Sequence, residues 1–145
     1  MKLAWVLWLA SMFQQPVGDR ACLAATVYLE ARGESVMGQM AVAEVAMRRL
    51  ESGQWGKSVC AVLKARGQFA LSTTGKNYIF SDVDSWREAW LVADAAMEMW
   101  NLPPNLRMSV VPKADHFYAS NSGAPSWAKG SPLAVIGEHT FYRAD

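Results

Sequence analysis

The chain has 145 residues, of which 52% are hydrophobic and 19% are charged, with 14 basic and 13 acidic side chains. A chain of this length and composition can bury a core without a metal, so we expect one globular domain. The balanced charge lacks the basic excess typical of nucleic-acid binding and argues against nucleic acid as a partner.

Residues 1–18 differ from the rest of the chain. After Lys2, an apolar run at residues 3–13 has about half of the ~20 residues that span a bilayer. This pattern predicts a signal-like segment and export to the periplasm, cell envelope or medium. An uncleaved anchor with membrane contact through residues 3–13, and a buried first helix of a cytosolic domain, also fit. We expect residues 19–145 to form the domain and to fold without residues 1–18.

The next predicted helix starts near Asp19 and ends at Gly33. Its apolar residues recur every three or four positions and put Glu30 on or beside the buried stripe. A partly desolvated carboxyl group holds its proton near neutral pH, as a general acid must. An ordinary surface cluster also fits, with Arg32 pairing with Glu30 or Glu34.

The middle of the chain predicts two more helices. One runs from Ser35 to about Leu50, and Gly38 inside it indicates a close approach to the helix that carries Glu30. The other is short, is capped by Ser58 and ends at Lys64. Residues 67–72 have no helical period and are predicted to be a strand or extended loop.

The C-terminal part predicts a helix followed by a small sheet. Ser85 and Glu88 have the spacing of a capping box, and the helix should end before Pro103. Residues 114–120 and 135–143 are predicted to form an antiparallel pair of strands. The expected fold class is α+β, a mainly helical, lysozyme-like domain with a small antiparallel β-sheet.

Several short motifs occur in an order that resembles the SleB/CwlJ-type cell-wall hydrolases. The resemblance extends from about Cys22 to Tyr142, and Ala70 stands where the family often carries a serine. The matching pieces are Cys22 before residues 28–34 (YLEARGE), Gly38-Gln39 with residues 41–43, Val59-Cys60 with residues 67–69 (GQF), and residues 136–139 (IGEH) with Phe141-Tyr142.

The resemblance implies a peptidoglycan-degrading enzyme that cleaves the glycan strand between N-acetylmuramic acid and N-acetylglucosamine. It implies a lytic transglycosylase, in which the 6-hydroxyl of muramic acid attacks the anomeric carbon and Glu30 serves as the one acid and base. We expect a monomer without cofactor or metal. The predicted substrate-binding residues are Glu34, Gln68, Phe69, Tyr118, Trp127, His139 and Tyr142.

The two cysteines are predicted to pair. An even count in an exported domain favours a disulfide between Cys22 and Cys60, and the resemblance suggests the same, although two buried free thiols also fit. The small size of the chain favours a phage lysin over a spore or wall-remodelling enzyme.

Two other functions fit the sequence. Asp115-His116 and Glu138-His139 contain the only two histidines and could form the zinc site of an N-acetylmuramoyl-L-alanine amidase. A catalytically silent glycan-binding module is the third reading.

Overall fold

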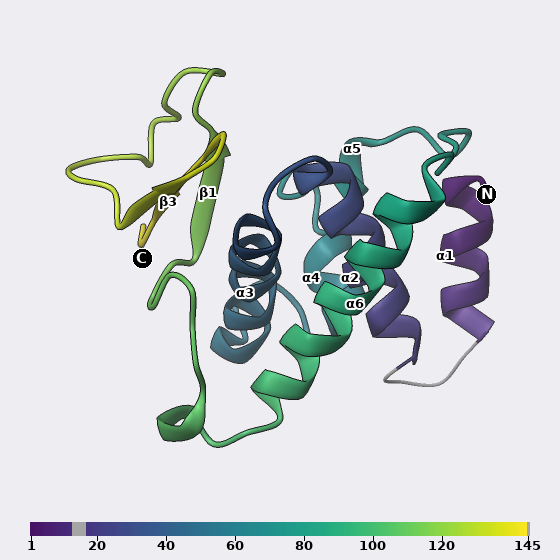
Figure 1. Ribbon diagram of the computed structural model, residues 1–145, viewed down its shortest axis with the longest axis horizontal. Helices are drawn as coiled ribbons and strands as arrows, with labels where there is room; N and C mark the ends of the chain where they lie inside the picture. The colour runs from purple at the N-terminus through teal and green to yellow at the C-terminus, as the bar shows by residue number, and fades with distance from the viewer. Residues whose placement is uncertain (13–16, 145) are drawn as a thin grey trace.

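The computed structural model describes residues 1–12 and 17–144, so Phe13, the end of the predicted apolar run, lies outside the described residues. The small sheet lies at one end of the molecule beside α3, and α1 lies at the other end (Figure 1). The elements are α1 (Leu3–Met12), α2 (Val17–Ala31), α3 (Val36–Ser52), α4 (Val59–Lys64), α5 (Ala70–Thr73), α6 (Val83–Trp100), the 3-10 helix η1 (Pro104–Leu106), β1 (His116–Ala119), β2 (Ala134–Ile136) and β3 (His139–Tyr142).

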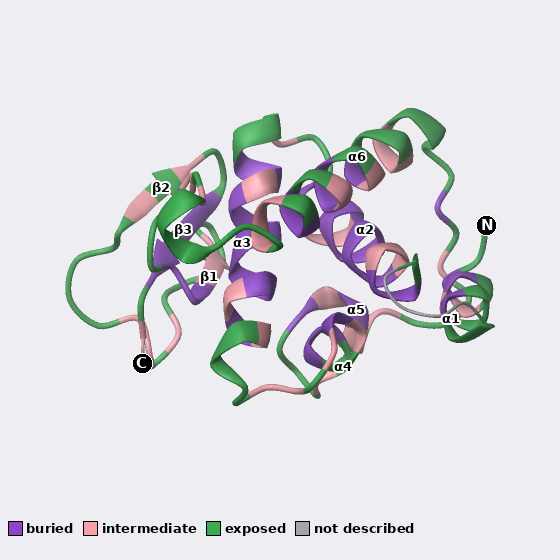
Figure 2. Cartoon of the chain, turned by 90° about the horizontal axis from the view of Figure 1, so that it is seen from below, coloured by how far each residue is buried: buried purple, intermediate pink, exposed green. Residues whose placement is uncertain are grey.

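Helix α2 is the centre of the core. It packs against all five other α-helices, and ten of its fifteen residues are buried (Figure 2). The small residues Ala24, Ala25 and Thr26 are fully buried, which lets neighbouring helices come close. The predicted disulfide is confirmed: Cys22 of α2 is bonded to Cys60 of α4, with the two Cα atoms 5.4 Å apart. The helix that carries Glu30 is therefore held by packing along its length and by a covalent link to α4.

Helix starts follow local side-chain capping. Ser35 accepts a hydrogen bond from the Gly38 amide at the start of α3, and Ser58 accepts one from the Ala61 amide at the start of α4, where the sequence predicted a cap. The capping box predicted at Ser85 is wrong. Asp82 caps α6 instead, and its carboxylate accepts from the Ser85 amide, so the helix begins at Val83.

Two predictions for the middle of the chain are corrected. Residues 67–72 are not a strand, because Ala70–Thr73 form the short helix α5 with Phe69 at its N-cap. Gly38 does make a close approach, but not to α2. A Cβ atom there would lie 3.5 Å from side-chain atoms of Glu34 and Ile136, so α3 approaches the turn after α2 and strand β2.

The sheet has three antiparallel strands in the order β1-β3-β2, where the sequence predicted a pair. Residues 135–143 do not form one strand, because the chain turns at Gly137, whose φ of 54° is in the left-handed region that favours glycine. In the register, Phe117 lies opposite Phe141 and Ala119 opposite His139. The expected fold class, mainly helical with a small antiparallel sheet, is confirmed.

Helix α1 packs on the domain through one face. Leu3, Val6 and Ala10 are buried, and the backbone amides of Leu3 and Ala4 donate to carbonyls of Tyr78 and Lys76. Among the described helices, none combines the length and apolar character that crossing a bilayer requires. The packing agrees with the buried-first-helix reading, whereas export and cleavage of residues 1–18 stay predictions.

Candidate active site

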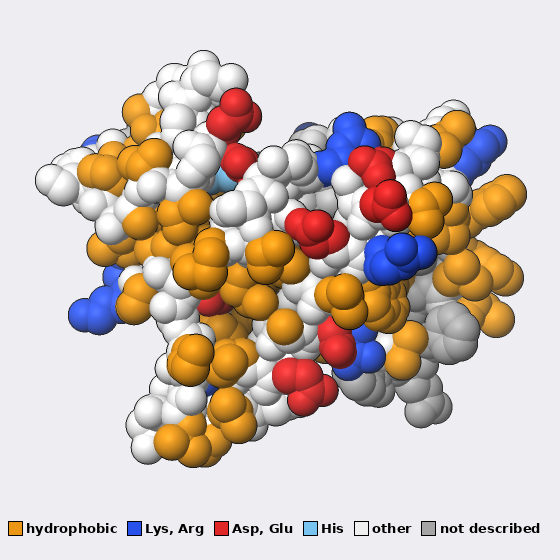
Figure 3. Space-filling model, in the orientation of Figure 1, with side chains coloured by type: hydrophobic (Ala, Val, Ile, Leu, Met, Phe, Trp, Pro, Cys, Tyr) orange, Lys and Arg blue, Asp and Glu red, His pale blue; other side chains and the backbone are white. Residues whose placement is uncertain are grey.

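Glu30 lies in the last turn of α2 and lines a cavity of about 390 Å³ between the helices and the sheet. In the space-filling view, acidic side chains and a histidine lie together where the sheet meets the helices (Figure 3). Burial raises the pKa of Glu30 to about 7, and a hydrogen bond from the Ala70 backbone and the positive charge of Arg49 partly oppose this shift. At neutral pH the carboxyl group can therefore both donate and accept a proton.

The interaction with Ala70 uses its backbone amide. For this reason the contact survives at a position where the resembling family often carries a serine. Phe69 comes just before it, is buried, and packs against Phe117 of β1 with ring centres 6.0 Å apart. Gln68 is exposed, and its side-chain oxygen accepts a hydrogen bond from Arg49 at 3.3 Å.

Glu34 lines the same cavity but is engaged differently. One carboxylate oxygen accepts the backbone amide of Glu138 at 2.8 Å, in the turn between β2 and β3. A Cβ atom at Gly137 would overlap this carboxylate, so the glycine allows the close approach. Glu34 thus connects the turn before β3 to the end of α2, and one oxygen of its carboxylate is used in this hydrogen bond.

His139 completes the wall of the cavity. Its Nδ1 lies 3.4 Å from a carboxylate oxygen of Glu34, and burial lowers its pKa, although Glu34 and the Glu30 backbone act in the opposite direction. Histidine in this position is therefore neutral at neutral pH.

Arg32 does not pair with Glu30 or Glu34 through a described ion pair. Its guanidinium donates to the Tyr28 hydroxyl at 2.6 Å and lies 4.8 Å from the centre of that ring. The same hydroxyl accepts from the amide of Asp82, the cap of α6. The predicted surface ion pair of Arg32 with Glu30 or Glu34 is therefore not found among the described residues. Arg32 instead contacts Tyr28, at the point where α2 meets the start of α6.

The sheet separates the predicted binding residues into two groups. Side chains alternate along a strand, so the register puts one set towards the helices and the other away from them. We call the first set, which reaches the Glu30 cavity and Phe69, the inner face: Phe117, Ala119, His139 and Phe141. The outer face comprises His116, Tyr118, Thr140 and Tyr142.

The outer face carries three of the predicted binding residues. The rings of Tyr118 and Tyr142 stack with centres 6.2 Å apart, and Trp127 meets each edge-on at 5.9 Å. None of the three lines the cavity of Glu30. The structure therefore brings together Glu30, Glu34 and His139, with Phe69 behind them, and holds the other aromatic residues on the opposite side of the sheet.

The two histidines of the zinc reading lie on opposite faces of the sheet. His116 Nδ1 contacts the Asp115 carboxylate at 2.8 Å and its ring packs against Trp127, whereas His139 faces Glu34. Within residues 1–12 and 17–144, no three histidine, cysteine, aspartate or glutamate side chains are grouped as metal ligands. These residues do not fit a two-histidine zinc site.

The sequence reasoning missed Arg49, which acts on Glu30 from α3. A signal was present, because Arg49 follows Val42, Val45 and Ala46 at spacings of seven, four and three and so falls on the buried stripe of its helix. A cationic residue on a buried stripe needs compensating contacts, and these are often found at functional sites.

Comparisons with known proteins agree with this fold. The chain is 32% identical over 124 residues to the spore cortex-lytic enzyme of Bacillus subtilis, covering 85% of this chain but only 37% of that protein. The catalytic domain of the germination-specific lytic transglycosylase SleB from Bacillus anthracis has a similar fold, with a TM-score of 0.67, 24% identity, and coverage of 90% of this chain and 96% of that domain. Residues 33–142, more than half of the chain, match the model of the Cell Wall Hydrolase family. The resemblance seen in the sequence is confirmed, and the chain belongs to the Cell Wall Hydrolase family.

Proposed function

We propose that the protein cleaves the glycan strand of peptidoglycan between N-acetylmuramic acid and N-acetylglucosamine as a lytic transglycosylase, with Glu30 as its acid and base. The observation that carries the proposal is a half-buried glutamate with a pKa of about 7 at the wall of a cavity. A related fold belongs to a domain named as a lytic transglycosylase. Glu30 lies outside residues 33–142, so its role rests on geometry and electrostatics.

In this reaction, protonated Glu30 donates its proton to the oxygen of the glycosidic bond as that bond breaks. The 6-hydroxyl of the muramic acid then attacks the anomeric carbon, and the Glu30 carboxylate takes up the hydroxyl proton. The products are a 1,6-anhydro end and a new 4-hydroxyl, and Glu30 returns to its protonated form. Neither water nor a second carboxylate takes part.

The state of Glu34 supports a mechanism with one carboxylate. A glycosidase of the usual kind needs a second carboxylate to activate water or to trap the sugar. Glu34 is the nearest in sequence, but its carboxylate accepts the Glu138 amide and lies beside His139. Glu138 also lines the cavity, and its exposed side chain is the other candidate for that role.

The proposal is tested by digesting purified peptidoglycan with the protein and with Glu30→Gln, without added metal. Glutamine keeps the shape of the side chain but cannot deliver a proton. We expect a loss of activity of about 10²–10⁴-fold or more, since the same residue is acid and base. Mass spectrometry should find 1,6-anhydro muropeptides, and circular dichroism should show that the variant is folded.

Other products of the digest would contradict the proposal. Reducing ends would indicate hydrolysis and a role for Glu138. Release of free stem peptides that stops with a chelator, with Glu30→Gln still active and His116→Ala inactive, would indicate the zinc amidase. Binding to peptidoglycan without any product would indicate a glycan-binding module.

We also propose that the substrate strand contacts more of the protein than the cavity. Glu34, His139, Gln68 and Phe69 would shape the site around the cleaved bond. Tyr118 of the outer face and Trp127 would bind sugar units further along the strand, where aromatic rings suit stacking on sugars. The support is that both side chains are partly exposed. Tyr142 is only 7% exposed, so it would contribute by holding these two rings in place.

A cell-wall substrate requires action in the cell envelope, so we propose that the protein is exported. The disulfide is consistent with an oxidising compartment outside the cytoplasm.

We propose in addition that α1 contacts the membrane surface. The outer side of α1 is apolar, with Trp5 and Trp8 exposed by 59% and 60%, and α1 contains no charged residue. Sedimentation with lipid vesicles tests this, and equal binding by the protein and by Trp5→Ser/Trp8→Ser would contradict it.

A further inference from the structure

Arg49 is the most deeply buried arginine near the cavity of Glu30. Only 4% of it is exposed, and its guanidinium lies between two rings, 4.2 Å from the centre of Trp55 and 4.9 Å from that of Phe69. Its Nε donates to the backbone carbonyl of Asp115 at 2.8 Å and its Nη1 to the side chain of Gln68 at 3.3 Å. One planar group thus links α3 to two segments distant in the chain.

Both linked segments adjoin the cavity of Glu30. Residues 68–70 end at the amide that hydrogen-bonds to Glu30, and Asp115 directly precedes β1, whose Ala119 lines the cavity. Arg49 is also the cation whose charge lowers the pKa of Glu30 against the effect of burial. Its position therefore affects both the walls of the cavity and the proton on the acid.

We propose that Arg49 is a positioning residue for the reaction at Glu30: it holds the segment of Gln68 and Phe69 and the start of β1 in place and keeps a fixed positive charge beside the carboxyl group. The inference rests on the proposed role of Glu30 as acid and base. In that role, the charge matters most in the second half of the reaction, when Glu30 is an anion.

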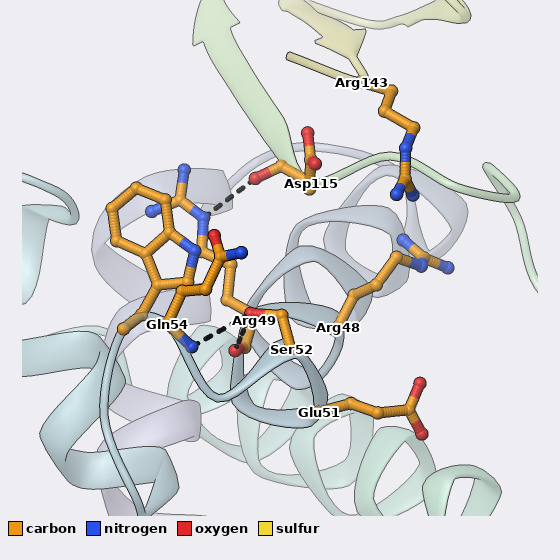
Figure 4. Close-up of a pocket in the computed structure, with 8 residues that line it drawn as sticks. Arg48, Arg49, Glu51, Ser52, Gln54, Asp115 and Arg143 are labelled. Atoms are coloured by element: carbon orange, nitrogen blue, oxygen red, sulfur yellow. Dashed lines mark hydrogen bonds between the residues drawn. The ribbon is translucent and has the colours of Figure 1, made fainter. Parts of the chain in front are cut away.

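The neighbouring Arg48 separates this role from a purely structural one. The side chain of Arg48 leaves α3 in another direction (Figure 4). It donates to the backbone carbonyl of Ala114 and, at 3.0 Å, to the Ser109 hydroxyl. The two arginines thus hold consecutive carbonyls of the same segment. Of these two arginines, Arg49 is the one whose charge lowers the pKa of Glu30.

Other titratable groups face the cavity and have to be kept constant in a test. Arg32 and Glu34 lie at and just after the end of α2, and Glu138 and His139 lie at the start of β3. Arg49 approaches from α3. Substitutions at Arg49 leave the first four in place, so a change in the titration of Glu30 can be assigned to Arg49.

The experiment compares Arg49→Met, which keeps length without charge, Arg49→Lys, which keeps charge without the planar fork, and Arg48→Met as the matched control. The first readout is the ¹³C carboxyl signal of Glu30 as a function of pH, assigned with Glu30→Gln. This needs no turnover. The second is the pH profile of kcat and KM on soluble glycan strands.

In Arg49→Met we expect the pKa of Glu30 and the upper limit of the activity profile to rise together, by on the order of one pH unit or less. In Arg49→Lys we expect the pKa to stay near that of the original protein while kcat falls, because lysine cannot stack and donate along two directions. Arg48→Met should lower stability without either change.

An unchanged Glu30 titration in Arg49→Met, or the same shift in Arg48→Met, would overturn the inference. If Arg49→Met does not fold, Arg49→Lys decides, because unaltered kcat and KM in that variant would rule out positioning. A different result would contradict the proposed function: Glu30→Gln would stay active. The titration of Glu30 would still report whether Arg49 acts on it.

Discussion

The inner and outer faces of the small sheet differ in what their side chains contact: the inner face adjoins the cavity of Glu30, and the outer face carries an aromatic cluster. On the inner face, Phe117 and Phe141 pack towards the helices and His139 closes the cavity. On the outer face, Tyr118 and Tyr142 stack on each other, Trp127 meets both edge-on, and none of the three lines that cavity. Alternation along four-residue strands is enough to separate the side chains that line the cavity of Glu30 from an aromatic cluster on the other side of the sheet.

The comparison is tested most strongly by the pH dependence of stability. The inner face and the helices desolvate Glu30, so its pKa is about 7 in the folded protein against 4.5 for an exposed glutamate. The folded state therefore retains a proton that the unfolded state releases, and stability falls as pH rises from about 4.5 to about 7. The loss amounts to at most ~3 kcal/mol.

Glu30→Gln removes this dependence. We expect the variant to gain stability relative to the original protein across that pH window, with the full gain above pH 7, as measured by urea unfolding at several pH values. His139 has a lowered pKa and contributes in the opposite direction, but it is present in both proteins and cancels in the difference. A constant difference from pH 4 to pH 8 would mean that Glu30 is not desolvated.

The helical part could be predicted from the sequence because its signals are local. Ser58 caps α4 as expected, α3 begins next to Ser35 as expected, and the apolar spacing puts Glu30 beside the buried face of α2. The start of α6 was misjudged because Asp82 and Ser85 are both good caps, and only the structure tells which carboxylate or hydroxyl accepts the amide.

The remainder depends on contacts between distant residues. Helix α5 has four residues and no periodicity to detect, and Arg49 holds the segment before it from another helix. The division of Tyr118 and His139 between two faces follows from the strand register, in which a shift of one residue would exchange them. Sequence spacing could therefore place Glu30 beside the buried face of its helix but could not tell which aromatic residues share its cavity.

The link between the inner face and α2 is tested by Glu34→Gln. The variant weakens the hydrogen bond that the Glu34 carboxylate accepts from the Glu138 amide and should cost about 1–2 kcal/mol of unfolding free energy. Activity should fall less than in Glu30→Gln, because the acid itself is retained. Glu138→Gln is the control for stability: its backbone amide still donates, so a loss equal to that of Glu34→Gln would contradict the role of this hydrogen bond.

The smallest expected effect concerns the outer face. If Trp127 stacks on a sugar unit distant from the cleaved bond, Trp127→Ala should raise KM for long glycan strands by roughly 2- to 10-fold, the equivalent of one aromatic contact. Short fragments do not reach Trp127, so their KM should not change, and kcat should be the same for both substrates because Glu30 and the inner face are intact. Steady-state release of muropeptides from strands of defined length measures this. Equal KM values for long strands, together with a lower melting temperature, would mean that Trp127 only packs against Tyr118 and Tyr142.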